Sequence, residues 1–228
     1  IMFSMSKKLI CLASFVVVLP LVGNVQAQDA TWTDATGDHN WFTSKNWSEF
    51  PTPAHWAKIR NGLPGPMIAS GSALASRVHI GYSEGGALTM DGGTLDISGD
   101  DLLMGKNGNT GTLNMNGGTI TVARDLEVAG GNPGIVNMTG GTIIVGDDFE
   151  IPESEGDGVS IAEVHLDGGS IIIGGDLHMF DQGSLGITSG TLVINGNAVS
   201  AVQGYIDNGW ITAYGGNGTV QFDYDVTN

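Results

Sequence analysis

A phrase of ten residues recurs five times along this chain and limits the folds open to it. Four copies contain Gly-Gly followed by Thr or Ser, and the last copy has Ser-Gly in place of the glycine pair. The copies occupy residues 88–97, 113–122, 136–145, 164–173 and 185–194, so their first residues lie 25, 23, 28 and 21 positions apart. Self-similarity at such a period predicts a solenoid, in which each repeat packs only on its neighbours.

Apolar and polar residues alternate within each repeat, which is typical of short β-strands. The first repeat has alternating segments at 88–90, 95–97 and 102–104. Strands this short need partners, and equivalent strands of successive repeats supply them at a spacing of about 4.8 Å. The glycine pairs fall at the corner between the first two strands, where a tight bend favours positive φ. We therefore expect an all-β, right-handed parallel β-helix of about five to six coils, with three short strands per coil and a β cap at each end.

The beginning of the chain has the composition of an export signal. Two lysines precede an apolar stretch over residues 9–22, and Ala27 offers a small residue for cleavage, so we interpret residues 1–27 as a signal peptide. Its removal leaves 6 basic against 24 acidic residues, a formal net charge of −18, and no cysteine, because Cys11 lies in the leader. This charge excludes nucleic acid as a partner but suits metal cations and neutral glycans. We expect a secreted or cell-surface protein with no membrane span in the mature chain.

The mature chain divides into three parts. Residues 28–75 form a tryptophan-rich N-terminal cap, residues 76–200 the β-helix repeats, and residues 201–228 a closing coil. The tryptophans of the first part either cover the open end of the solenoid or form a platform on which sugars stack. These tryptophans are Trp32, Trp41, Trp47 and Trp56.

A short polar residue precedes the third strand of each coil: Asp101, Asp125, Asp148, Asp176 and Asn197. Such residues cap turns, so this column favours a structural role, with bound calcium as the alternative.

The outward positions of the third strands carry the candidate chemistry. In-register stacking would place Glu127 about 5 Å from Glu150, with His178 one coil further on. Three interpretations remain open: a solvated polar face, a divalent cation site, or a catalytic carboxylate pair with Arg124 as the nearest base.

The other two strands present different outer columns. The first strands carry Asn114, Asn137 and His165, a polar ladder able to meet sugar hydroxyls. The second strands carry Ile144, Ile172 and Val193, an apolar stripe suited to a covering segment or to self-association.

The longest linker, residues 150–158, is acidic and could gather calcium, although a solvated loop is the alternative. The calcium candidates are Asp147, Asp148, Glu150, Glu153, Glu155 and Asp157. The pattern requires no cofactor, and calcium is the one cofactor that it admits. No P-loop, HExxH or CxxC motif is present.

The tryptophan-rich opening, the Leu-x-Met-x-Gly-Gly-Thr coils and the ending at 205–213 resemble secreted bacterial repeat proteins of planctomycete-like lineages. Such proteins often carry a C-terminal PEP-CTERM sorting signal. The coils are also similar to autotransporter passengers and pectin-lyase-like β-helices. The resemblance implies a β-helix fold but no active-site residues. Because the sequence ends at Asn228 without that sorting signal, we expect a truncated chain or a released protein.

These observations favour a non-catalytic extracellular or cell-surface module for structure or adhesion, with extracellular polysaccharide or cell-surface components as partners. The alternative is a polysaccharide-active enzyme, either a lyase or a glycoside hydrolase. A carbohydrate-binding module is the third reading.

Overall fold

The computed structural model describes residues 27–60, 62, 64–107, 109–153 and 160–224. All but the last residue of the predicted signal peptide lies outside these residues, as do the calcium candidates Glu155 and Asp157.

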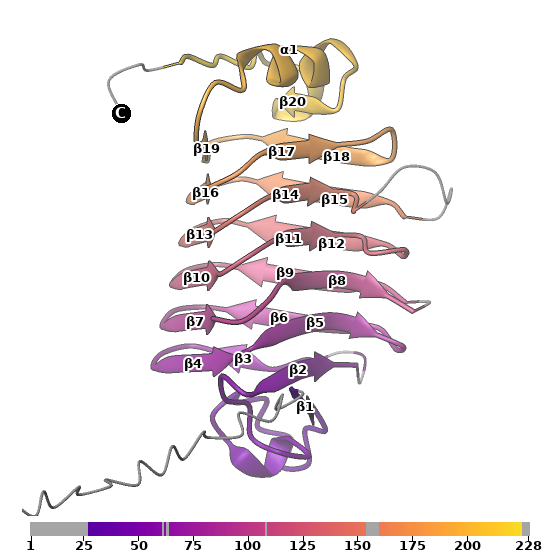
Figure 1. Ribbon diagram of the computed structural model, residues 1–228, viewed down its shortest axis with the longest axis vertical. Helices are drawn as coiled ribbons and strands as arrows, with labels where there is room; N and C mark the ends of the chain where they lie inside the picture. The colour runs from indigo at the N-terminus through magenta and orange to yellow at the C-terminus, as the bar shows by residue number, and fades with distance from the viewer. Residues whose placement is uncertain (1–26, 61, 63, 108, 154–159, 225–228) are drawn as a thin grey trace, which may run out of the picture.

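Strands of successive coils pair in parallel and build three sheets that run the length of the molecule (Figure 1). The first-strand sheet contains β3 (Met67–Ile68), β6 (Gly86–Met90), β9 (Gly111–Met115), β12 (Gly134–Met138), β15 (Ala162–Leu166), β18 (Gly183–Ile187) and β20 (Ile211–Ala213). The second-strand sheet contains β4 (Ser72–Ala75), β7 (Thr94–Ile97), β10 (Thr119–Val122), β13 (Thr142–Val145), β16 (Ser170–Ile173) and β19 (Thr191–Ile194). The third-strand sheet contains β1 (Gln28–Thr31), β2 (His55–Ile59), β5 (Arg77–Tyr82), β8 (Leu102–Lys106), β11 (Leu126–Val128), β14 (Phe149–Ile151) and β17 (Leu177–Met179).

The parallel β-helix predicted from the repeat is thus confirmed. Two of its sheets hold seven strands, so the solenoid has about seven coils instead of the five to six expected. The additional coils come from β1 to β5, whose sequences lack the Gly-Gly phrase.

The core consists of apolar columns stacked along the solenoid axis. Leu88, Leu113 and Val136 occupy one register position of the first-strand sheet and are fully buried. Each buried aliphatic side chain of this size contributes roughly 1.5–3 kcal/mol to folding. Together with the neighbouring columns they form one buried apolar cluster that extends from β3 to β20.

The glycine pairs make the corner for two separate reasons. Gly118 has φ 78°, a left-handed conformation that disfavours other residues, and a Cβ there would lie 2.6 Å from the carbonyl oxygen of Gly93. Its neighbour Gly117 has an ordinary φ, but a Cβ would lie 2.7 Å from the carbonyl oxygen of Asp91. The second glycine therefore permits the bend, and the first lets two coils approach.

The N-terminal cap is built around three buried indoles. Trp47 packs edge-on against Trp32 and Trp41, with ring centroids 5.0 and 4.7 Å away, and its Nε1 donates to the Trp41 carbonyl oxygen at 2.8 Å. η1 (Ser44–Asn46) lies in the same segment. The three indoles belong to the same buried apolar cluster as the coils and lie at the N-terminal end of the solenoid (Figure 1).

The C-terminal end differs from the β cap that the sequence predicted. Residues Val199–Asp207 form the helix α1, which precedes β20 and η2 (Tyr214–Gly216) at the end of the solenoid (Figure 1). Val202, Tyr205 and Ile206 turn one side of this helix toward the core. Among the residues that the structure describes, no helix is long and apolar enough to span a membrane.

Candidate functional site

The outer face of the third-strand sheet brings the predicted charged residues together. Leu103 pairs in register with Glu127, Glu127 with Glu150, and Glu150 with His178. The stacked column that the repeat predicted is therefore present. His79 extends it on the other side of Leu103.

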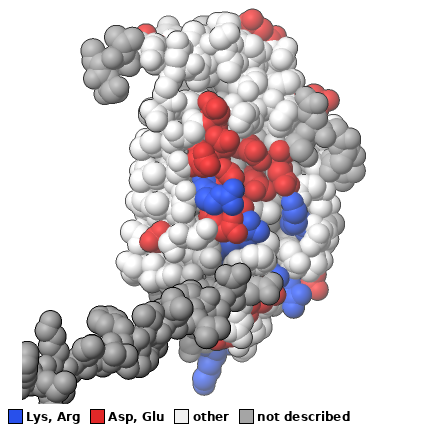
Figure 2. All heavy atoms as spheres, viewed as in Figure 1, with Lys and Arg blue, Asp and Glu red and all other residues white. Residues whose placement is uncertain are grey.

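Charge is distributed unevenly over this face. Acidic side chains gather in one patch, with basic side chains among them and toward the N-terminal coils (Figure 2). The basic part includes Lys58, Arg77 and Lys106, and the acidic part extends from Asp101 to Asp176. The face therefore changes from mainly basic to mainly acidic along the solenoid axis.

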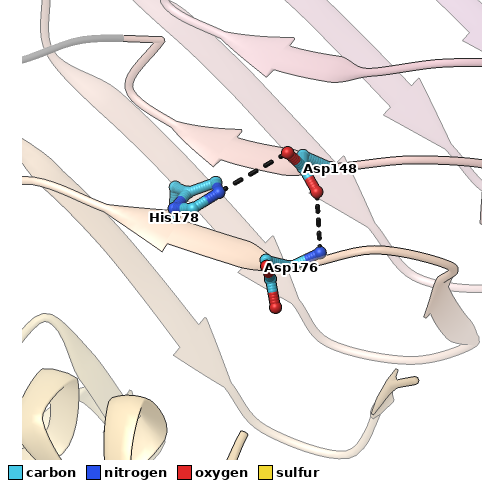
Figure 3. Close-up of side chains that lie close together, drawn as sticks. All are labelled: Asp148, Asp176 and His178. Atoms are coloured by element: carbon cyan, nitrogen blue, oxygen red, sulfur yellow. Dashed lines mark hydrogen bonds and ion pairs between the residues drawn. The ribbon is translucent and has the colours of Figure 1, made fainter. Parts of the chain in front are cut away.

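The aspartates before the third strands connect consecutive coils. The backbone N–H of Asp125 donates to Oδ1 of Asp101 at 3.4 Å, and that of Asp148 donates to Oδ1 of Asp125 at 3.0 Å. The N–H of Asp176 continues the series with Oδ1 of Asp148 at 2.7 Å (Figure 3). We call this series the aspartate ladder. It supports the structural role expected for the column, although each side chain bonds the next coil instead of its own turn.

The second carboxylate oxygen in the ladder faces a basic group. Arg77 binds Oδ2 of Asp101, and Arg124 lies 3.7 Å from Oδ2 of Asp125. The His178 ring lies 3.5 Å from Oδ2 of Asp148 (Figure 3). The two arginine pairs offset the repulsion between stacked carboxylates, so the column is partly neutralised from within the protein.

Glu127 and Glu150 have perturbed pKa values. Burial, followed by the charge of Glu153, raises the pKa of Glu127 to about 8. Burial, followed by the charge of Asp125, raises the pKa of Glu150 as well. At neutral pH Glu127 is therefore largely protonated in the folded protein, so its carboxyl can donate a proton.

The bases on this face are occupied by acids. The Arg77 guanidinium lies 2.7 Å from Oδ1 of Asp100, and Lys106 Nζ lies 2.8 Å from Oε2 of Glu153. Arg124, the base expected beside the carboxylate pair, lies 3.2 Å from Oδ1 of Asp100.

Sequence reasoning did not identify His79 as unusual. It is 5% exposed, and neither ring nitrogen has a hydrogen-bond partner. Burial, with the nearby charge of Arg77, lowers its pKa to about 4, so the ring is neutral at pH 7. Tyr82 stacks on the ring, with centroids 5.2 Å apart. The repeat predicts the position of His79 opposite Leu103, but the burial of His79 depends on its aromatic neighbours Tyr82 and Trp56.

The sugar-stacking platform is not available at three of the four tryptophans. Trp32, Trp41 and Trp47 are buried in the cap, so a sugar cannot reach their faces. Trp56 is half-buried, and its ring lies 5.0 Å from the Arg77 guanidinium. Aromatic residues clustered in sequence are also compatible with a small hydrophobic core, and in this cap three of the four tryptophans form one.

The polar ladder on the first-strand sheet is in register. Nδ2 of Asn137 donates to Oδ1 of Asn114 at 3.0 Å, and His165 pairs with Asn137 in the next coil. The His165 ring also lies 3.5 Å from Glu163. Sugar binding by this ladder stays a prediction.

The apolar stripe on the second-strand sheet is exposed as expected. Ile144, Ile172 and Val193 are 37%, 38% and 45% exposed. Ile172 and Val193 border a hollow of about 1010 Å³, which Phe222 and Tyr224 line from the C-terminal segment. Self-association through the stripe stays a prediction.

The calcium candidates are brought together only in part. Asp147 and Asp148 offer oxygens within 4.8 Å of one on Asp125, whereas Glu153 is engaged by Lys106. A second group joins Asp148, Asp176 and His178 at the same separation. A third group joins Asp101 and Asp125 to Glu127, from two columns that the sequence suggested separately as cation sites.

Comparison with family models, with curated proteins and with solved structures found no match for this chain. Its class therefore follows from its own structure: a parallel β-helix with a charged third-strand face.

Proposed function

We propose that this protein is a non-catalytic β-helix module that is exported and serves a structural or adhesive role outside the cell. Export is inferred from the composition of residues 1–27, and the acidic surface suits contact with polysaccharide or cell-surface components. A rigid solenoid with three extended faces is well suited to such a role, because it offers long surfaces for repeated weak contacts.

One observation carries the non-catalytic part of this proposal. The charged groups of the third-strand face are used to hold the coils together, through the aspartate ladder and through the ion pairs of Arg77, Arg124 and Lys106. A polysaccharide lyase of the β-helix type needs a base free to take a proton from a uronate. Each of these three bases instead has a carboxylate within hydrogen-bond reach.

Two measurements test the proposal. The purified protein is incubated with uronate-containing and neutral polysaccharides, with and without calcium, and products are followed by absorbance of unsaturated ends and by reducing ends. We expect no turnover, together with retention of polysaccharide by immobilised protein. Turnover that disappears in Arg124→Ala would overturn the non-catalytic role.

Export is tested separately by expressing the chain in a bacterial host and sequencing the N-terminus of the recovered protein. We expect cleavage after Ala27 and recovery outside the cytoplasm. An uncleaved cytoplasmic product would refute the export proposal without touching the catalytic question.

A glycoside hydrolase is the second candidate, and the raised pKa of Glu127 beside the carboxyl of Glu150 favours it. A carboxyl with a pKa of about 8 can act as a general acid beside a neighbouring carboxylate in a stacked register. In that case Glu127→Gln and Glu150→Gln would each abolish release of reducing ends, while the exposed Glu163→Gln would leave it unchanged.

A further inference from the structure

Three carboxylates converge where β8 and β11 begin. Asp101 immediately precedes β8, Asp125 precedes β11, and Glu127 lies within β11 on the same outer face. Leu102 and Leu126 pair in register, so Asp125 stacks on Asp101 and Glu127 lies one outward position further along. One carboxylate oxygen from each residue lies within 4.8 Å of the other two.

Glu127 is the unusual member of this group. It is 9% exposed, and its Oε2 is buried without a hydrogen-bond partner. Its register neighbours are Leu103 and Glu150, and neither side chain carries a proton donor when Glu150 is ionised. Ionisation of Glu127 is unfavourable here, because its buried oxygen has neither a donor nor a cation as partner, and a bound cation would remove that penalty.

The nearby bases do not supply that partner. Arg77 is held by Asp100 and Asp101, and Lys106 by Glu153. Arg124 approaches Asp101 and Asp125 only at 4.0 and 3.7 Å.

The Arg124 side chain is 55% exposed, so it can move into solvent without disturbing the core. Arg77 can keep its ion pair with Oδ2 of Asp101 when a cation binds. Oδ1 of Asp101 and Oδ1 of Asp125 accept backbone N–H groups at 3.4 and 3.0 Å, and a carboxylate oxygen has lone pairs for a second partner.

We propose that Asp101, Asp125 and Glu127 form a binding site for a divalent cation of the calcium type. Two oxygens bound to one Ca²⁺ at 2.3–2.6 Å can be separated by at most about 5 Å, and all three pairs meet this limit. Mg²⁺ demands near-ideal octahedral geometry, whereas Ca²⁺ accepts an irregular set of oxygen ligands, so side chains fixed by the two coils favour the larger ion. Water completes the coordination on the solvent side. This site is independent of export and of polysaccharide contact.

The site is tested by isothermal titration of the purified, EDTA-treated protein with CaCl₂ and, separately, MgCl₂. We expect calcium to bind with a stoichiometry near one and more tightly than magnesium. Glu127→Gln, which keeps the shape of the side chain, is expected to weaken calcium binding at least tenfold. The matched control Glu163→Gln replaces an exposed glutamate of the first-strand sheet and is expected to bind as the unmodified protein does.

Far-UV circular dichroism checks that each variant keeps the fold, and the calcium-induced rise in Tm gives a second readout. Absence of calcium binding up to about 10 mM, tenfold above the weak limit of ~1 mM for extracellular calcium modules, would overturn the proposal. Equal binding by Glu127→Gln and the unmodified protein would also overturn it, because the calcium would then belong to other acids.

Discussion

The aspartate ladder makes a sharp prediction at Asp148. Its Oδ1 accepts the Asp176 N–H at 2.7 Å, and its Oδ2 lies 3.5 Å from the His178 ring. Alanine at this position removes the acceptor and leaves the N–H of the next coil without its partner. Asparagine keeps an oxygen in the same place and removes only the charge. The column itself already ends in Asn197, whose amide oxygen accepts the Val199 N–H at 3.3 Å.

The two substitutions should therefore differ in size. A hydrogen bond to a charged group contributes about 1.5–3 kcal/mol, and the Asp148 side chain is 33% exposed, so we expect Asp148→Ala to lower the free energy of unfolding by about 1–2 kcal/mol. The His178 pair is solvent-exposed and contributes about 0–1 kcal/mol, so Asp148→Asn should lose less than about 1 kcal/mol. For a domain of this length, each kcal/mol corresponds to a Tm change of roughly 2–4 °C.

Thermal unfolding in EDTA, followed by circular dichroism, measures the difference. Asp181→Ala, at an exposed aspartate of a nearby turn, is the control and should leave Tm unchanged. If Asp148→Asn destabilised the protein as much as Asp148→Ala, the stabilising effect of Asp148 would come from its charge and not from the hydrogen bond between coils. An Asp148→Ala protein as stable as the unmodified one would refute the ladder.

Three further predictions concern other parts of the scaffold. Because burial raises the pKa of Glu127 from 4.5 to about 8, ionisation opposes folding, and stability should fall as the pH rises through this window. Across this window the loss in the free energy of unfolding should be on the order of 3 kcal/mol after allowance for solvent screening. Urea denaturation in EDTA at a series of pH values should show that Glu127→Gln removes this loss, and an unchanged pH dependence would contradict the assignment. Gly118→Ala should lower Tm sharply because of its φ of 78° and the backbone contact at 2.6 Å, whereas Gly85→Ala, with its nearest contact at 3.7 Å, should be nearly neutral. Leu113→Ala should cost about 2–5 kcal/mol in chemical denaturation, since the stacked column leaves a cavity, and a loss below about 1 kcal/mol would argue against a packed core.

The repeat made most of the fold predictable. Alternation within each phrase identifies the strands, and the recurrence of the phrase fixes which residues stack. The pairings of Glu127 with Glu150 and of Asn114 with Asn137 both follow from the spacing alone. The same alternation continues through successive coils, so shifting one strand by a single residue would move all its apolar side chains from the core to the surface.

The sequence predicted less where the repeat ends. Val199, Val202 and Ile206 follow a helical spacing, but the repeat predicts a third strand after Asn197, because Ala198 and Ser200 occupy the positions of its inward residues. Nine residues give only a short helical signal, and its docking depends on the open end of the solenoid.

The site was predictable in position but not in detail. Stacking placed Glu127 in a column, yet its burial and its approach to Asp101 depend on how neighbouring side chains fill the face. The use of aspartates as links between coils was hidden for the same reason, because sequence spacing does not reveal which N–H a carboxylate accepts.

The central claim is that equivalent strands of successive coils stack in parallel and in register. Asn114 and Asn137 are register partners whose side chains are hydrogen-bonded at 3.0 Å, and the only cysteine of the chain, Cys11, can be replaced by serine. In that background we expect Asn114→Cys with Asn137→Cys to form a disulfide under mild oxidation, since in-register strands lie about 4.8 Å apart. Asn114→Cys with His165→Cys places the thiols two coils apart, about 10 Å, which a disulfide cannot span. Peptide mapping by mass spectrometry that finds the first bridge and not the second supports the register, and equal formation of both, or of neither, would contradict it.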